Sequence, residues 1–347
     1  MKNLNKKTLA LIGALIPTLL FGGCGDEPIP YRQEDHGRFT EEFAPHENVN
    51  GWWYVTGYLT DVNNPDNIYS FQYTQFNFRN AFFPDGYVLQ LALTNLQTGE
   101  HLSESHFSPS DKWVYANREW VAFLPFSLLQ RGKNSLHLLG KMENATVILH
   151  FNLGKGGAWH GDNGVLVMGL PDDPIQRTVY YSYTNMPTYG KITLVNDNGE
   201  ETTIQVEGKS WFDRQWGPFR MFDASSSYWE WFSLRFFDDE EVMLFSFPQH
   251  PYQDGTYIDV DAHTHRLQNY TYVPTGYIKT ETSCYSFGWE LTMPGIKEEH
   301  YRIEPLVDSQ TQTQYFELTA AIINDDDERV GYAFVELLPF IRTGMCE

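Results

Sequence analysis

The chain has 347 residues, of which 41% are hydrophobic and 16% aromatic, and it carries a formal net charge of −21 at pH 7. So acidic a surface is repelled by phosphate, and basic patches with interleaved aromatic residues are missing from the sequence, so nucleic acid is excluded as a partner. The length is sufficient for two folded domains.

The first 23 residues follow the order of charged, apolar and small residues that is typical of secretory signals. Three lysines precede an apolar stretch over residues 9–21, and two glycines then lead to Cys24. This stretch contains Pro17 and is shorter than the ~20 apolar residues that a membrane-spanning helix needs. We therefore predict a lipoprotein signal peptide over residues 1–23 and lipidation of Cys24, with simple secretion as the alternative.

Acyl chains on Cys24 would anchor the exported chain to a membrane. Gly25 follows the cysteine where an aspartate would retain the protein at the inner membrane, so we expect the outer membrane, facing the periplasm or the cell surface. Residues 24–48 hold three prolines and many charges without hydrophobic periodicity, which predicts a flexible tether between the anchor and the fold.

Two further cysteines, Cys284 and Cys346, lie in the second half of the chain. An exported protein could pair them, because its compartment permits disulfides. Cys346 is the penultimate residue, and chain ends are usually mobile. The sequence therefore leaves both a disulfide and two free thiols open.

Short runs in which apolar and polar residues alternate follow one another along the folded part of the chain. Residues 89–93 and 147–153 are two of these runs, and this period of two is typical of strands with one buried face. In another run, the apolar positions change parity between Tyr73 and Phe76, which predicts a β-bulge. Helical periodicity is scarce, so the pattern predicts an all-β fold of antiparallel hairpins.

Length and the placement of Pro187 suggest where this all-β fold divides. We predict an N-terminal β domain over residues 49–186 and a C-terminal β domain over residues 187–347.

A series of segments in this order carries a family resemblance. They are Gly51–Leu59 (GWWYVTGYL), Phe76–Arg79, His160–Gly164 (HGDNG), Tyr180–Ser182, Gly208–Gly217 (GKSWFDRQWG), Trp229–Leu234 (WEWFSL) and Gly331–Leu337. Together they resemble the motifs of the AttH-like and carotenoid 1,2-hydratase-like proteins, a lipocalin-like family. The chain departs from the family pattern at Gly51, Arg214 and Glu230, where the family has glutamate, histidine and aspartate.

The resemblance implies two lipocalin-like antiparallel β-barrels packed together, with pockets for apolar ligands. In some members it also implies chemistry on isoprenoid or other polyunsaturated chains. Nucleophile elbows, phosphate loops and zinc-finger spacings are missing from the sequence, so we expect no cofactor. The aromatic residues of the motifs and one arginine form the expected ligand-binding set: Trp52, Trp53, Tyr54, Arg79, Tyr181, Trp211, Trp216, Trp229 and Trp231.

Two acidic residues between tryptophans are the candidate catalysts. Addition of water to an alkene needs a strong proton donor and stabilisation of a carbocation, and a protonated carboxyl group among aromatic rings supplies both. Asp213 would share a strand face with Trp211, and Glu230 is the second candidate acid. The alternatives are that Asp213 pairs with Arg214, which would keep it ionised, or caps a turn, and that Glu230 is a buried glutamate bonded to the backbone.

Four polar residues at spacing two are a weaker candidate for a metal site. Asp259, Asp261, His263 and His265 would share one face of a continuous strand and could bind zinc, although an outward-facing polar row has the same pattern. His160, which lies among glycines, is expected in a turn with local hydrogen bonds.

Two functions from different classes remain. The first is a membrane-anchored lipoprotein that binds a long isoprenoid or acyl molecule and transforms it by acid catalysis, as a hydratase-like lyase, isomerase or cyclase. The alternative is a non-catalytic lipid carrier, with a transporter as its partner.

Overall fold

The computed structural model describes residues 39–47, 49–78, 86–220, 229–250, 252–280, 283–308, 316–338 and 346. The predicted signal peptide, Cys24, the first part of the predicted tether and Arg79 lie outside these residues. In the described part of the chain, no helix is long and apolar enough to cross a membrane.

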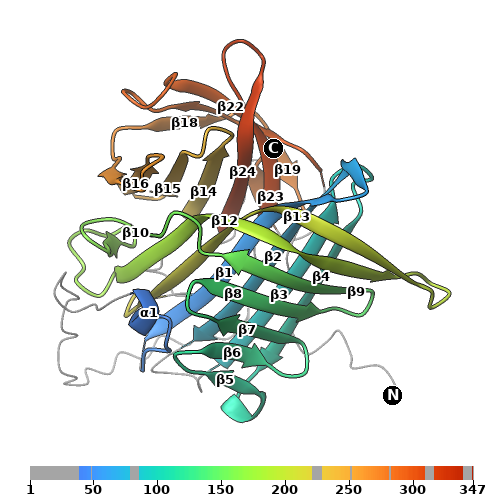
Figure 1. Cartoon of the computed structure of the whole chain (residues 1–347). Coiled ribbons are helices and arrows are strands. Elements are labelled where there is room, and N and C mark those ends of the chain that lie inside the picture. The colour runs from blue at the N-terminus through green and yellow to red at the C-terminus, as the bar shows by residue number, and fades with distance from the viewer. Residues whose placement is uncertain are drawn as a thin grey trace.

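The first part of the chain forms a 13-stranded antiparallel sheet that curls into a nearly closed barrel (Figure 1). Its strands follow the order β4-β3-β2-β1-β13-β12-β9-β8-β7-β6-β5, and two short strands pair with β12. The strands are β1 (Asn50–Asp61), β2 (Asn64–Phe78), β3 (Gly86–Asn95), β4 (His101–Ser108), β5 (Val114–Ala116), β6 (Trp120–Phe123), β7 (Ser127–Arg131), β8 (Ser135–Lys141), β9 (Ala145–Asn152), β10 (Gly157–Trp159), β11 (Val165–Val167), β12 (Arg177–Val195) and β13 (Glu201–Gly217).

The second part forms a nine-stranded half-barrel, in the order β17-β16-β15-β14-β24-β23-β22-β21-β18, and a separate pair, β19-β20. These strands are β14 (Trp229–Phe236), β15 (Glu241–Phe247), β16 (Tyr252–Ile258), β17 (Thr264–Arg266), β18 (Thr271–Pro274), β19 (Tyr277–Lys279), β20 (Cys284–Ser286), β21 (Trp289–Thr292), β22 (His300–Pro305), β23 (Phe316–Ile323) and β24 (Arg329–Leu338). The predicted all-β fold with two packed lipocalin-like units is thus confirmed, with the second unit an open half-barrel.

The barrel interior is filled by every second side chain of its strands, as the sequence pattern predicts. Leu89, Leu91 and Leu93 on β3 all lie in the core of the first sheet, because every second residue of a strand projects to the same face. The second sheet has a core of its own around Trp289. The two sheets therefore each bury one face independently.

The boundary between the two sheets differs from the predicted one. Pro187 lies inside β12, which pairs with β13 and β9 of the first sheet, so a domain border there is wrong. The sheets instead divide between Gly217 and Trp229. A proline is tolerated at this point because the ladder between β12 and β13 is already irregular, with a register shift just before it, between Tyr183 and Met186.

The predicted tether is shorter than expected, because its last residues pack on the barrel. A short helix, α1 (Phe39–Glu42), is followed by Phe43, which is only 1% exposed and belongs to the barrel core. The Trp53 indole donates a hydrogen bond to the Phe43 carbonyl oxygen at 2.9 Å. Phe39 also packs against this core, so two aromatic side chains attach the otherwise charged arm to the fold.

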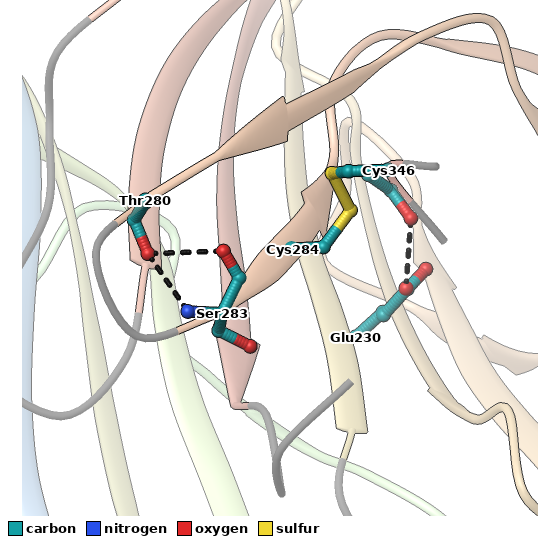
Figure 2. Close-up of a disulfide and its surroundings, with 6 residues drawn as sticks. Glu230, Thr280, Ser283, Cys284 and Cys346 are labelled. Atoms are coloured by element: carbon teal, nitrogen blue, oxygen red, sulfur yellow. Dashed lines mark hydrogen bonds between the residues drawn. A yellow bond between two sulfur atoms is a disulfide. The ribbon is translucent and has the colours of Figure 1, made fainter. Parts of the chain in front are cut away.

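Cys284 and Cys346 form a disulfide, which resolves the alternative that the sequence left open. Their Cα atoms are 5.8 Å apart, and the bond ties the end of the chain to β20 (Figure 2).

Candidate functional site

The two sheets pack face to face, and a third cluster of buried side chains, here called the seam, lies between them. It contains residues from both sheets: Trp52, Tyr54, Leu166, Met168, Tyr180, Trp211, Phe219, Trp229, Trp231, Met243, Phe245, Phe247 and Phe334. Trp52 stacks on Trp229 across the seam, with ring centroids 6.0 Å apart, and the Trp211 ring lies 5.9 Å from Trp231. Both faces of the β1–β13 wall are therefore buried.

Asp213 lies in this aromatic layer. It projects from β13 on the same face as Trp211, as the alternation predicts, and only 4% of the residue is exposed. The Trp211 Nε1 group donates a hydrogen bond to Asp213 Oδ1 at 2.6 Å, and the Ser182 hydroxyl donates to the same oxygen. Ser182 reaches it because β12 pairs with β13 in a register that sets these two residues opposite each other.

The surroundings of Asp213 keep its carboxyl group close to half-protonated at neutral pH. Burial raises its pKa to about 7, since desolvation disfavours the charged form, and hydrogen bonds from Ser182, Trp211 and Tyr180 oppose this rise. The negative charge of Glu336 raises the pKa further. Burial therefore has the largest effect on Asp213.

A hydrogen-bonded chain continues from Asp213 across the seam. His160 Nε2 lies 2.7 Å from Ser182 Oγ, and His160 Nδ1 lies 2.9 Å from Thr256 Oγ1 on the second sheet. The Ser182 hydroxyl donates its proton to Asp213, so its oxygen has to accept the hydrogen bond from His160, whose Nε2 therefore carries the proton. In this neutral tautomer, His160 Nδ1 carries no proton and accepts from the Thr256 hydroxyl. Burial lowers the pKa of His160 to about 3, which fits this neutral tautomer.

Glu336 is a second carboxyl group at the seam. It projects from β24 opposite Trp231, and the Trp229 indole donates a hydrogen bond to its Oε1 at 2.6 Å. Burial raises the pKa of the Glu336 carboxyl to about 7. The negative charge of Glu336, on the second sheet, thus acts on Asp213, on the first, and both carboxyl groups have raised pKa values.

The predicted ligand-binding residues separate onto two faces of the barrel wall. Tyr54, Trp52, Trp211, Trp229 and Trp231 all lie in the seam around Asp213. The other described members lie in the barrel interior: Trp53, Tyr181 and Trp216.

The alternative pairing of Asp213 with Arg214 is wrong. Successive strand residues project to opposite faces, so Arg214 points into the barrel, where its guanidinium lies 4.1 Å from the centroid of the Trp53 ring. It donates hydrogen bonds to the carbonyl oxygens of Trp52 and Ala44, at 3.2 and 2.7 Å. The positive charge of Arg214 therefore lies inside the barrel and does not pair with Asp213.

Glu230, the second candidate acid, is buried away from Asp213. It projects to the opposite face of β14 from its neighbouring tryptophans, into the half-barrel. Ser286 Oγ donates a hydrogen bond to its Oε1 at 3.2 Å, and Figure 2 shows Glu230 beside the disulfide. The structure thus does not bring the two predicted acids together.

The polar row at residues 259–265 does not form the continuous strand that the metal hypothesis needs. Asp259 N donates to the carbonyl oxygen of His263 at 3.1 Å, and the residues between them turn, with Ala262 at a φ of 66°. Asp259 Oδ2 lies 3.1 Å from His263 Nδ1 and 3.6 Å from His265 Nε2, on the surface, and Asp261 lies within the turn, where its N–H donates to Asp259 Oδ1 at 3.0 Å. Among the described residues, no group of three or more His, Cys, Asp or Glu side chains could hold a metal ion.

Four residues of the site were not predicted as functional: Tyr180, Ser182, Glu336 and the ring of His160. The predicted turn around His160 is present, since Gly164 N donates to the His160 carbonyl oxygen at 2.8 Å, but its imidazole points into the seam. The sequence signal for these residues is the alternation of side chains along a strand, which sets Tyr180 and Ser182 on one face of β12. For Glu336, the signal is an acidic residue in a strand of mostly apolar residues. Neither signal could show that a second sheet covers that face.

Ser182 offers a direct test of how the acid is tuned. Because its hydrogen bond stabilises the ionised carboxyl group, Ser182→Ala is expected to raise the pKa of Asp213 above about 7. Carbon-13 NMR of labelled aspartate carboxyl groups during a pH titration measures the shift. Ser70→Ala is the matched control, since Ser70 is a buried serine whose hydroxyl accepts a hydrogen bond from Thr319 Oγ1 at 2.9 Å, and this variant should leave the pKa of Asp213 unchanged. Equal titrations for both variants would contradict this interpretation.

Comparison with known proteins places this architecture in a family. The family model described as AttH-like matches residues 30–339. The structure is similar to that of a protein described as AttH from Nitrosomonas europaea, with 20% sequence identity and a TM-score of 0.78, over 90% of this chain and 100% of that one. It is also similar to kievitone hydratase from Nectria haematococca, with 17% identity and a TM-score of 0.69, over 87% of this chain and 92% of that one.

A search of curated proteins found no matching sequence. The family model covers most of the chain, and both solved structures share its arrangement of two β units. The chain is therefore a member of the AttH-like family.

Proposed function

We propose that this protein binds a long apolar molecule, isoprenoid or acyl, at the seam and that Asp213 adds a proton to one of its carbon–carbon double bonds. The observation that carries this proposal is a buried carboxyl group with a pKa of about 7, set in a layer of aromatic rings. At neutral pH, a substantial fraction of such a group is protonated, whereas an exposed aspartate is almost fully ionised.

Protonation of the alkene breaks the O–H bond of Asp213, forms a C–H bond and leaves a carbocation on the adjacent carbon. The faces of aromatic rings attract positive charge. Trp211 and Trp231 meet edge to face at 5.9 Å, and Tyr54 meets Trp231 at 5.6 Å, so rings surround the acid in several orientations. These rings are packed against one another, so a ligand has to displace side chains to reach Asp213.

Hydration then requires a base that takes a proton from the attacking water. Glu336 fits this role in its ionised form, because the indole of Trp229 orients its carboxylate by a hydrogen bond of 2.6 Å. The water oxygen forms the C–O bond, its proton passes to Glu336, and exchange with solvent restores the proton on Asp213. The net reaction adds one water to one alkene, and loss of a proton from the cation instead would give isomerisation.

The likeness to kievitone hydratase, a protein named for a hydration, supports this class of reaction as a proposal, while at 17% identity it shows the fold alone. We further propose that lipid on Cys24 anchors the protein to the cell envelope, close to membranes where apolar molecules dissolve.

The test begins with residues 25–347 purified from the native host without delipidation. Native mass spectrometry should detect one retained apolar molecule, and incubation of that molecule with fresh protein should convert it to a product heavier by one water or to an isomer. Asp213→Asn should keep the ligand and lower turnover by about 100-fold or more. Glu230→Gln is the control, because Glu230 faces the half-barrel interior and should leave turnover unchanged.

Each alternative gives a different result. A retained ligand that the parent protein does not convert would favour the carrier. Equal turnover by the parent and Asp213→Asn would exclude Asp213 as the acid, and the absence of any retained apolar molecule would contradict binding.

A further inference from the structure

An exposed aromatic face lies on the edge hairpin of the first sheet, formed by β5 and β6. Trp113, Tyr115 and Leu124 are 53%, 42% and 44% exposed. They are neighbours, because β5 pairs with β6 and the Leu124 N–H donates to the Trp113 carbonyl oxygen at 2.8 Å. The three side chains therefore form one outward-facing patch, here called the rim patch.

The barrel core does not account for these side chains. Val114 and Phe123, which lie opposite each other on β5 and β6, both point into the core, so Trp113, Tyr115 and Leu124 beside them project from the other face of the hairpin, where all three are exposed. Trp120 lies 5.9 Å from Tyr115 and extends the patch, and Lys112 Nζ lies 5.1 Å from the Trp113 ring. Adjacent exposed aromatic and apolar side chains with a basic residue at their margin are typical of surfaces that contact another phase or partner.

The rim patch lies at the end of the barrel where the chain enters from its N-terminal arm. β1 begins at Asn50, and the next residue, Gly51, pairs with Asn77 of β2. Asn77 pairs with Tyr87 of β3, which pairs in turn with Ser108, the last residue of β4. The start of β1 and the end of β4 therefore lie at the same end of the barrel. A 3-10 helix, η3 (Asp111–Trp113), begins three residues after Ser108 and leads into the patch. In Figure 1, β5 lies at the bottom of the barrel, away from the second sheet.

We propose that the rim patch docks on the surface of a phospholipid bilayer. Tryptophan and tyrosine prefer the interface between headgroups and acyl chains, because their rings are apolar and their N–H and O–H groups stay hydrated. The arm from Cys24 to Phe39 reaches at most about 50 Å when extended, so an anchored chain holds this end of the barrel near the membrane.

This docking goes beyond the proposed function and needs neither turnover nor lipid on Cys24. Acidic residues surround the hairpin as well as basic ones, with Asp111 and Glu119 beside Lys112 and Arg118. The attraction is therefore apolar, and added salt should change it little.

Flotation of residues 25–347 with vesicles of phosphatidylcholine, which carry no net charge, tests the proposal. We expect the protein to float with the vesicles at low and at high salt, and its tryptophan emission to shift to the blue. The double variant Trp113→Ser/Leu124→Ser should lower the vesicle-bound to free ratio by about tenfold or more.

The matched control is Tyr189→Ser/Val273→Ser, which removes two comparably exposed side chains, 57% and 61%, away from the rim patch. It should float like the parent. Three outcomes would overturn the proposal: no binding by the parent, equal binding by the rim-patch variant, or equal losses in the two variants. Unfolding curves of both variants, expected to match the parent, separate docking from loss of structure. Because flotation does not measure turnover, failure here leaves the acid mechanism untouched.

Discussion

Asp213→Asn is expected to make the protein more stable above pH 7 while it removes the proposed acid. Burial raises the folded-state pKa of Asp213 from 3.8 to about 7, so ionising this group opposes folding. The folded state holds the proton more tightly than the unfolded state, and stability therefore falls as the pH rises from about 4 to about 7. At higher pH the full cost applies, up to about 4 kcal/mol.

An amide keeps the acceptor oxygen for Ser182 and Trp211 and carries no charge. Urea unfolding at pH 5 and pH 8 should give a gain for Asp213→Asn that is larger at pH 8. Asp254→Asn is the contrasting control: Asp254 is equally buried but is paired with Arg266 at 2.6 Å, so its amide should lower stability at both pH values. A parent that is more stable than Asp213→Asn at pH 8 would show that the folded state favours the ionised carboxyl group.

Cys346→Ser is expected to lower the free energy of unfolding by about 4 kcal/mol, because the disulfide closes a loop of 62 residues and restricts the unfolded chain. Chemical denaturation under non-reducing conditions measures this loss. The parent protein with a reducing agent should reproduce the value for the variant, and the reducing agent should leave Cys346→Ser unchanged. Equal stability of the parent with and without reductant would contradict a structural role for the bond.

The sequence predicted the features that depend on neighbouring residues. Alternation identified the core strands, and it set Trp211 and Asp213 on one face before any contact was known. The same rule misled at residues 73–76, where a change of parity suggested a bulge. The ladder between β2 and β3 is continuous there, and Phe76 simply points to the other face, which packs against the seam.

The remaining features depend on contacts between residues far apart in the chain. Thr256 is 96 residues from His160, and Glu336 acts on Asp213 from the second sheet. These residues become neighbours only because the two sheets pack together. The pattern of residues within one strand cannot show how two sheets pack. Arg214 illustrates the opposite case. It is adjacent to Asp213 in sequence, but it lies on the opposite face of the strand and does not form the predicted ion pair with Asp213.

The packed end of the N-terminal arm gives the protein a mechanical property. Arg214 holds the arm by its hydrogen bond to the Ala44 carbonyl oxygen, and the next residue back along the same strand is Asp213. A force applied to the arm would therefore load three neighbouring strands of the barrel wall at once, β13 through Arg214, β1 through Trp53 and β12 through the Tyr181 hydroxyl, which donates to the Phe39 carbonyl oxygen at 3.1 Å.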